Sequence, residues 1–255
     1  MKEKFSIVIV CKNAAAVIGP VLQSAQNVTD NVVVYDNGST DHTLSVVQQF
    51  DHVQLHQGRW EGFGKTKQIA TTLAKYDWIL SLDADEALDP VLQQQLTELT
   101  LDDPAVVYDI RYKNFLGATY VRWGEWGFDH HIRLFNRQTV QWNDSPVHEA
   151  LVLPPNVRVK KLKGHILHHT IKDLQEYSQK VVRYALLNAE KYYAKGKKAT
   201  FIKRHFAPLF TFVKFYIFML GFLDGWAGLV CARMTAFYTF LKYARLYELQ
   251  KNGKS

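Results

Sequence analysis

The sequence predicts an α/β fold: a mostly parallel sheet covered by helices, followed by an α-helical, amphipathic C-terminal region. Apolar strands alternate with helical patterns through the first hundred residues, and continuous apolar strands are typical of parallel sheets buried on both faces. Past residue 171 the apolar residues recur at helical spacing among charged ones. We therefore expect two domains, residues 1–171 and residues 172–255.

The expected elements follow one another in a regular order. Strands are predicted over 5–13, 31–39, 53–57 and 78–84, and helices over 14–28, 40–50, 64–75 and 90–99. A region with the pattern of antiparallel strands follows over 105–170. Helices are then expected over 172–198, 200–220 and 226–250. In such sheets ligands bind beyond the carboxyl ends of the parallel strands, so the polar clusters that end three of them should converge on one cleft.

Charge is distributed unevenly along the 255 residues. Residues 1–150 carry 12 basic and 19 acidic side chains, and residues 151–255 carry 19 and 5, which gives net charges of −7 and +14. The two parts of the chain therefore face different partners.

The N-terminus and the cysteines indicate a cytoplasmic protein. The first apolar run, residues 5–11, is too short and too strand-like for a signal peptide. Cys11 and Cys231 lie in apolar surroundings far apart in the sequence, which favours buried thiols in a reducing compartment.

Residues 206–232 are apolar and long enough to span a bilayer, but Lys214 and Asp224 interrupt them and basic residues flank them. Three interpretations remain open: a helix lying in the headgroup region, a buried core helix and a membrane span. The first is favoured, because an apolar surface with Trp, Tyr and basic neighbours suits an anionic membrane surface. The basic and aromatic residues over 183–216 resemble a nucleic-acid site only superficially, since the aromatics cluster with aliphatic residues. We expect no nucleic-acid partner.

The stretch SLDADEAL, residues 81–88, follows a buried-looking strand with closely spaced carboxylates. On an extended strand end Asp83 and Asp85 would point to the same side and could address one metal ion. Hard oxygen ligands select Mg²⁺ or Mn²⁺, which also bridge to phosphate oxygens. The alternative is an acidic loop that caps the next helix.

The stretch YDNGSTDHT, residues 35–43, predicts a strand, a turn and a capped helix. Such a turn explains Gly38 to Asp41 but not Asp36. A carboxylate at the strand end could accept the N3 hydrogen of a uracil ring.

The order of IVIVCKN, VVVYDNGSTD, WEGFGKTKQIA, WILSLDADEAL, RLFNR and VHEAL resembles glycosyltransferase family 2. These are inverting enzymes with a GT-A fold that use nucleotide-diphosphate sugars, and the resemblance covers nearly the whole chain. The later GFLDGWAG and the aromatic, basic tail resemble the branch of lipopolysaccharide-core β-1,4-glucosyltransferases.

The resemblance implies residue roles. Lys67 stands where the family often places a basic residue near the nucleotide, with Lys65 as its competitor, and Asp85 with Asp83 would hold the metal. One departure is that Asn13 is followed by Ala14, where many relatives have Glu. The implied nucleotide-binding residues are Val10, Lys12, Asn13, Asp36, Lys67 and Asp83.

Displacement at an anomeric carbon also needs a base for the acceptor hydroxyl. Glu149 is favoured because a His-Glu pair like His148–Glu149 recurs in the branch, and Asp144 and Asp129 are the alternatives. Arg133, His148 and His168 could contact the diphosphate or orient the base. The three histidines of GHILHHT, residues 164–170, more often serve structure than bind a metal.

Together these features predict a metal-dependent hexosyltransferase at the inner face of the cytoplasmic membrane. It would pass a hexose, glucose from UDP-glucose in the favoured case, to a lipid-linked saccharide such as a lipopolysaccharide core precursor. The alternatives are a polyprenyl-phosphate glycosyltransferase and a non-catalytic, membrane-tethered sugar-nucleotide-binding module. A binding module has no need for a carboxylate on the acceptor side.

Overall fold

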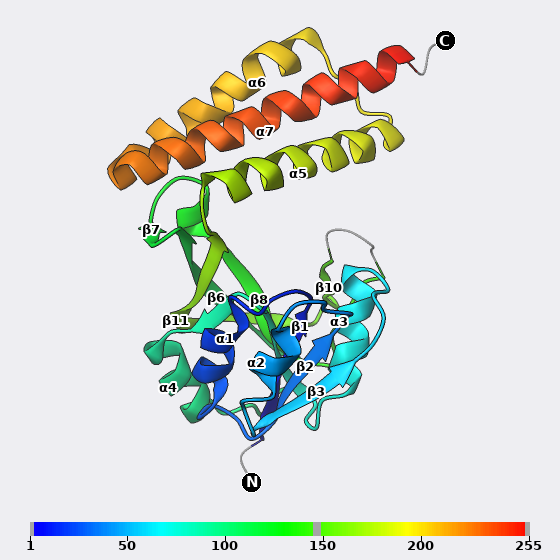
Figure 1. The fold of residues 1–255 in the computed structure, drawn as a ribbon, viewed down its shortest axis with the longest axis vertical. Helices are drawn as coiled ribbons and strands as arrows, with labels where there is room; N and C mark the ends of the chain where they lie inside the picture. The colour runs from blue at the N-terminus through cyan, green and yellow to red at the C-terminus, as the bar shows by residue number, and fades with distance from the viewer. Residues whose placement is uncertain (1–2, 145–148, 253–255) are drawn as a thin grey trace. The chain divides into compact units, whose positions relative to one another are not determined.

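The computed structural model describes residues 3–144 and 149–252. The chain forms two compact units, Met1–Tyr112 with His130–His168, and Lys113–Asp129 with His169–Ser255 (Figure 1). The second unit thus contains residues 113–129 in addition to the helical region. The functional boundary expected at residue 171 stays a prediction.

One mixed sheet organises the first unit. Its strands are β1 (Phe5–Cys11), β2 (Val32–Asp36), β3 (Val53–Gln57), β4 (Trp78–Asp83), β5 (Glu86–Leu88), β6 (Val106–Leu116), β8 (His130–Asn136) and β11 (Arg158–Ile171). They lie in the order β3-β2-β1-β4-β8-β6-β11-β5, and a ninth strand, β7 (Thr119–Val121), pairs antiparallel with β6. Helices α1 (Ile18–Ala25), α2 (Thr43–Val47), α3 (Phe63–Thr72) and α4 (Pro90–Glu98) connect them, and β9 (Gln141–Trp142) pairs separately with β10 (Leu151–Val152).

The predicted α/β fold is confirmed by the strand pairing. Strands β1, β2, β3 and β4 are parallel, and β8 pairs antiparallel with both β4 and β6. The parallel half corresponds to the alternating apolar strands and helices, and the antiparallel half to the region after residue 105. The carboxyl ends of the parallel strands form one edge, where a ligand site is expected.

The core packs against both faces of the sheet. Ile7 and Ile9 of β1 pack with α1 and α4 residues in one buried cluster, while Val8 packs with α3 residues in another. Each such side chain contributes about 1.5–3 kcal/mol when it is fully buried. This packing fixes the strands whose ends carry the polar side chains.

Both cysteines are free and buried, as predicted. Burial raises the pKa of Cys11 to about 12 and that of Cys231 to about 12. Neither thiol is therefore a reactive thiolate at neutral pH.

The second unit is mainly helical. It contains β7 (Thr119–Val121), the 3₁₀ turns η1 (Trp126–Phe128) and η3 (Gly221–Asp224), the π-helical turn η2 (Lys214–Phe218), and the helices α5 (Leu174–Ala194), α6 (Phe201–Val213) and α7 (Gly225–Asn252). Its core joins Val121 and Ile171 to Tyr177 of α5 and to Ala227, Val230 and Cys231 of α7. Residues 113–129 thus share a core with α5 and α7.

The apolar stretch over 206–232 does not form one continuous helix. Leu220 adopts a left-handed conformation with φ of 59°, and a side chain on Gly228 would place its Cβ 1.8 Å from the carbonyl oxygen of Gly221. The chain therefore turns sharply between α6 and α7. Within the described residues no single helix meets the length and hydropathy needed to cross a bilayer, whereas Phe201–Phe218 and Gly221–Asn252 meet them jointly with a bend of 72°.

Candidate active site

The ends of β1, β2 and β4 meet at one edge of the sheet, as the sequence predicted. Val10 pairs with Asp83 on one side and with Tyr35 on the other, and Cys11 pairs with Asp36. Three predicted site residues, Val10, Asp36 and Asp83, therefore lie on neighbouring strands.

The carboxylate of Asp36 orders the turn after β2. Asp36 is fully buried, and its Oδ2 accepts the backbone N–H groups of Gly38 at 3.1 Å and Ser39 at 3.0 Å. Its Oδ1 accepts the Ser39 hydroxyl and the Cys11 thiol. Two donors on each oxygen fill the acceptor positions of a carboxylate. A uracil N3–H would therefore have to displace one of these donors to reach Asp36.

Asn37 presents the acceptor that Asp36 lacks. The Asn37 side chain is 7% exposed, and its Oδ1 is buried without a hydrogen-bond partner among the described residues. Because an unpaired buried acceptor costs free energy, such an atom next to a ligand edge is a candidate for ligand contact. The sequence motif predicts Asn37 only as part of the turn.

Asn13 joins the loops that follow β1 and β2. It lies in the left-handed region with φ of 51°, its N–H donates to Ser39 Oγ at 2.8 Å, and its Oδ1 accepts the Thr40 N–H at 2.8 Å. Its side-chain oxygen is therefore already engaged. Lys12 beside it is exposed.

Lys67 bridges two of the predicted carboxylates. It lies on α3 with only 5% of its surface exposed, and its Nζ is 2.8 Å from Asp83 Oδ1 and 3.0 Å from Glu149 Oε1. Burial alone would lower the pKa of Lys67, but the nearby carboxylates outweigh it and the pKa is raised. The ammonium group therefore holds a strand end and the predicted base together.

Close packing of α3 makes this bridge possible. A Cβ on Gly64 would lie 1.8 Å from the Asn143 carbonyl oxygen, so only glycine lets α3 approach this segment. The Lys67 Nζ also lies 5.0 Å from the centroid of the Trp142 ring. The alternative Lys65 instead pairs with Glu61 at 3.0 Å, with both side chains partly exposed.

Arg133 of β8 forms a second, more buried cluster. Its Nη2 is 2.6 Å from Glu86 Oε1 and 3.1 Å from Asp83 Oδ2, and its Nε donates to the Tyr112 hydroxyl. Burial would raise the pKa of Asp83, but Lys67 and Arg133 hold it well below its usual range. Burial raises the pKa of Glu86, which is 1% exposed.

Replacing Arg133 with methionine is expected to lower the free energy of unfolding by about 3–5 kcal/mol, because Glu86 then stays buried without its cation. Chemical denaturation followed by two spectroscopic signals measures this change. The double variant Arg133→Met/Glu86→Leu should recover most of the loss, since apolar side chains can replace a buried pair.

The control Arg158→Met removes an ion pair at the surface, in which the Arg158 side chain is 66% exposed and the Asp103 side chain 35% exposed. This variant should change the free energy of unfolding by less than about 1 kcal/mol. A loss in Arg133→Met no larger than in this control would contradict the assignment.

Asp83 and Asp85 do not lie on one face of a strand. Strand β4 ends at Asp83 and residues 84–85 form a turn. The alternation of side chains along a strand, which predicted that both carboxylates bind one metal ion, therefore does not extend to Asp85. Both oxygens of Asp83 are engaged by Lys67 and Arg133, whereas Asp85 Oδ2 lies 3.4 Å from His168 Nε2. Burial would lower the pKa of His168, but its hydrogen bond to Asp85 and the negative charges of Asp85, Glu86 and Asp83 together outweigh this and raise the pKa.

The pair Asp85 and His168 has donor atoms that suit a divalent cation. One carboxylate with one imidazole fits Mn²⁺ or Mg²⁺, provided that phosphate oxygens and waters complete the coordination. Within residues 3–144 and 149–252 no group of three His, Cys, Asp or Glu side chains is arranged to hold a metal alone. The other histidines of this stretch lie apart from the pair: His165 contacts Asp89 at 3.2 Å, and the His169 ring stacks on Phe115.

The remaining predicted residues lie elsewhere. Asp144 is exposed, and Asp129 belongs to the second unit, where it accepts a hydrogen bond from Asn114 at 3.0 Å. His148 lies outside the described residues. The structure thus places Glu149 beside Asp83 and leaves Asp144 on the surface.

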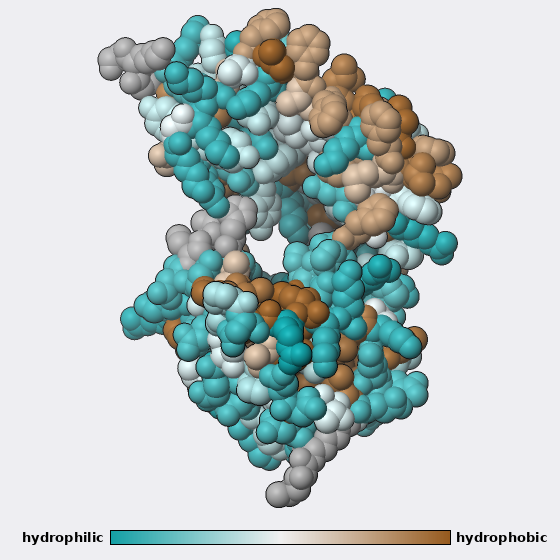
Figure 2. Space-filling view, turned by 180° about the vertical axis from the view of Figure 1, so that it is seen from behind, coloured by the Kyte–Doolittle hydropathy of each residue, from teal (hydrophilic) through white to brown (hydrophobic). Residues whose placement is uncertain are grey.

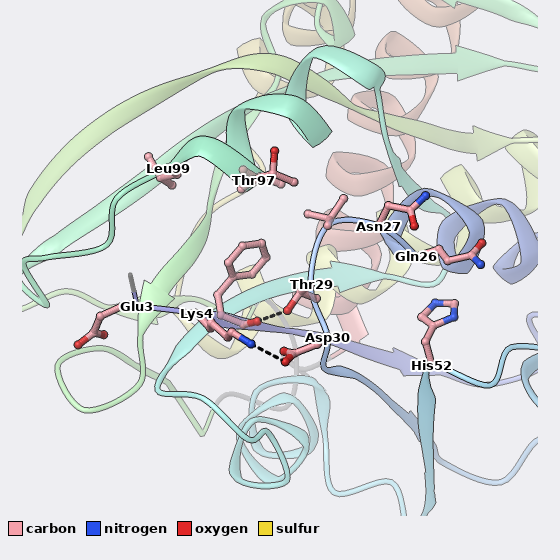
Figure 3. A pocket seen from close by; sticks show the side chains of 12 residues that line it. Glu3, Lys4, Gln26, Asn27, Thr29, Asp30, His52, Thr97 and Leu99 are labelled. Atoms are coloured by element: carbon pink, nitrogen blue, oxygen red, sulfur yellow. Dashed lines mark hydrogen bonds and ion pairs between the residues drawn. The ribbon is translucent and has the colours of Figure 1, made fainter. Parts of the chain in front are cut away.

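A separate cavity of about 580 Å³ lies near Phe5, at the amino end of β1. Lys4 and Asp30 form an ion pair of 2.7 Å at its wall, and the Thr29 hydroxyl donates to the Phe5 carbonyl (Figure 3). It contains none of the predicted site residues and lies at the opposite end of the strand from Cys11.

Comparison with known proteins identifies the family to which this sequence is similar. The model of the family described as glycosyl transferase family 2 matches residues 6–153. The lipopolysaccharide core biosynthesis glycosyltransferase LpsC of Rhizobium meliloti is 29% identical over 97% of this chain and 93% of its own length. An uncharacterized glycosyltransferase of Rickettsia typhi is 26% identical over 99% of this chain and 90% of its own. The crystal structure of S. aureus TarS 1–349 in complex with UDP-GlcNAc is 13% identical, with a TM-score of 0.48 over 98% of this chain and 92% of that one.

Proposed function

Because this chain belongs to glycosyl transferase family 2, we propose that it transfers a hexose from a UDP-sugar, UDP-glucose in the first instance, to a lipid-linked saccharide with inversion. The observation that carries the proposal is the bridge of Lys67 between Asp83 and Glu149, at 2.8 and 3.0 Å. It brings the predicted base to the strand edge that would hold the donor. The name of the relative LpsC supports a lipopolysaccharide core precursor as the acceptor.

In the proposed reaction Glu149 takes the proton of an acceptor hydroxyl. The acceptor oxygen then forms a bond to the anomeric carbon while the bond from that carbon to the diphosphate oxygen breaks, and UDP leaves. Glu149 Oε1 is bound to Lys67, and Oε2 has no hydrogen-bond partner within the described part of the chain. Oε2 is therefore the atom available to accept the proton.

Asp85 and His168 would hold the Mg²⁺ or Mn²⁺ ion. When bound, the ion would neutralise charge on the leaving diphosphate. Arg133 and Lys67 keep Asp83 ionised beside this pair, and Asp83 would contact the ribose or the metal.

The uracil ring would be recognised at the turn after β2. Asn37 Oδ1 is buried and unpartnered within the described chain, whereas the Asp36 carboxylate already accepts four hydrogen bonds. We therefore assign the N3–H contact to Asn37 and the ordering of the turn to Asp36. Val10, Lys12 and Asn13 would line the same pocket.

The protein would act on the inner face of the cytoplasmic membrane, where a lipid-linked acceptor is exposed. The net charge of +14 over residues 151–255 supports attachment to anionic lipid. No part of the proposed function needs a nucleic-acid partner.

Calorimetric binding of UDP-glucose, UDP-galactose, UDP-GlcNAc and GDP-mannose, each with Mn²⁺ and with EDTA, tests the donor half of the proposal. We expect one UDP-sugar to bind only with Mn²⁺ and to release UDP slowly in the absence of acceptor. EDTA should weaken binding by at least about tenfold, because the diphosphate loses its counter-ion. Binding without hydrolysis would favour a sugar-nucleotide-binding module, and metal-independent binding would contradict the role of Asp85 and His168.

A further inference from the structure

The second unit exposes many large apolar side chains between residues 201 and 226. Eleven of them are 38–75% exposed. Figure 2 shows apolar side chains gathered over one side of this helical unit. We call this group the apolar surface. Because exposed apolar patches on soluble proteins are usually smaller or scattered, its extent indicates an interaction site.

The arrangement of the helices concentrates these side chains. Ile202, Phe206 and Phe210 recur every four residues along α6 and so lie on one helical face. The left-handed Leu220 then turns the chain by 72° between the helices, next to the exposed Phe218. The apolar surface thus has a stripe on α6 and a corner at the turn.

Acidic residues are rare in the part of the sequence that forms the apolar surface. Asp224 is the only Asp or Glu between residues 191 and 247. Its Oδ2 accepts the backbone N–H groups of Arg122 at 2.9 Å and Trp123 at 2.7 Å. The carboxylate is therefore used within the unit. Lys203, Lys214 and nearby Arg233 are exposed instead.

We propose that the apolar surface docks on an anionic lipid bilayer, with the corner residues Phe218, Leu223 and Trp226 below the headgroups and the exposed lysines at the lipid phosphates. Burial of apolar side chains and attraction of basic ones act together on such a surface. The proposal deepens the membrane attachment within the proposed function, and it depends on no catalytic residue.

Charge favours lipid over a second copy of this chain. In a symmetric dimer the same patch meets itself, so the basic side chains of both copies, Lys203 and Lys214 among them, would be brought into one interface. Like charges close together are destabilising, whereas lipid phosphates neutralise them.

The test is sedimentation of the full chain with phosphatidylcholine vesicles and with phosphatidylcholine–phosphatidylglycerol vesicles, at low and high salt. We expect binding to the anionic vesicles that weakens with salt.

The variant Phe218→Ser/Leu223→Ser/Trp226→Ser should bind these vesicles at least about tenfold more weakly, since each change removes apolar area that the bilayer would bury. The control Val91→Ser/Phe128→Ser/Val159→Ser changes three apolar side chains that are 52–59% exposed and lie outside the apolar surface. It should bind as the unchanged chain does.

Trp226 is 75% exposed, and its fluorescence can report how deeply it enters the bilayer. Brominated lipids should quench its fluorescence in the bound state, and the conservative variant Trp226→Phe should bind normally but lose this quenching. Equal vesicle binding by the serine variant and its control would overturn the proposal. The proposal would also be overturned if the unchanged chain did not bind vesicles but formed a concentration-dependent dimer that the three serine substitutions dissociate. Because no donor or acceptor is present, these outcomes are independent of transferase activity.

Discussion

Replacing Asp85 with asparagine is expected to lower the transfer rate by about 10³-fold, because loss of a metal-binding carboxylate removes several kcal/mol of charge stabilisation at the leaving diphosphate. Asparagine keeps the size of the side chain, and Asp85 lies 3.4 Å from His168 at a partly exposed position. The fold should therefore be retained. The measurements are UDP release and the Mn²⁺ dependence of UDP-sugar binding.

A second variant separates metal binding from general damage to the site. His168→Gln should shift the Mn²⁺ concentration needed for half-maximal binding upward, as Asp85→Asn does, while the exposed control Asp102→Asn should leave it unchanged. Normal Mn²⁺ dependence in both variants would remove Asp85 and His168 from the metal site.

Glu149→Gln is expected to lower transfer by about 100-fold or more while UDP-sugar binding is kept, because glutamine cannot accept the hydroxyl proton. The amide oxygen can still accept a hydrogen bond from Lys67, so the bridge to Asp83 is only weakened. The measurements are single-turnover transfer to an acceptor and calorimetric binding of the donor.

The exposed carboxylate Asp144 supplies the matched control for the base. Asp144→Asn should leave transfer within about twofold of the unchanged enzyme, since surface carboxylates contribute little to site electrostatics. If Asp144→Asn abolishes transfer and Glu149→Gln does not, the base is wrongly assigned. If both retain activity, neither carboxylate takes the proton.

The fold could be predicted because it depends on local patterns. The alternation of apolar strands and helices predicted that β1, β2 and β4 are parallel, and the strand-end rule then predicted Asp36 and Asp83 at one edge. The contact between Lys67 and Glu149 joins residues 82 positions apart. The hydrophobic patterns of helices and strands say nothing about contacts between residues so far apart in the sequence. Only the family resemblance indicated both residues.

The directions in which side chains point within turns could not be predicted from the sequence. The turn after β2 buries Asp36 among its own backbone donors and leaves Asn37 as the unpaired acceptor, which a motif of residue types does not reveal. The same limit applies to SLDADEAL. A strand continued by two residues would align Asp83 with Asp85, but β4 ends at Asp83, and Glu86 becomes the buried partner of Arg133.

The hydrogen bonds from residues 122 and 123 to Asp224 have a consequence for recombining this sequence with its relatives. Cutting the chain at residue 171 would remove the Asp224 acceptor and also Ala227, Val230 and Cys231, against which Val121 packs. A catalytic fragment made this way would keep residues 113–129 without their packing partners, and the apolar side chains of this segment would be exposed. When the helical region is exchanged for that of a relative, segment 113–129 should therefore be exchanged with it.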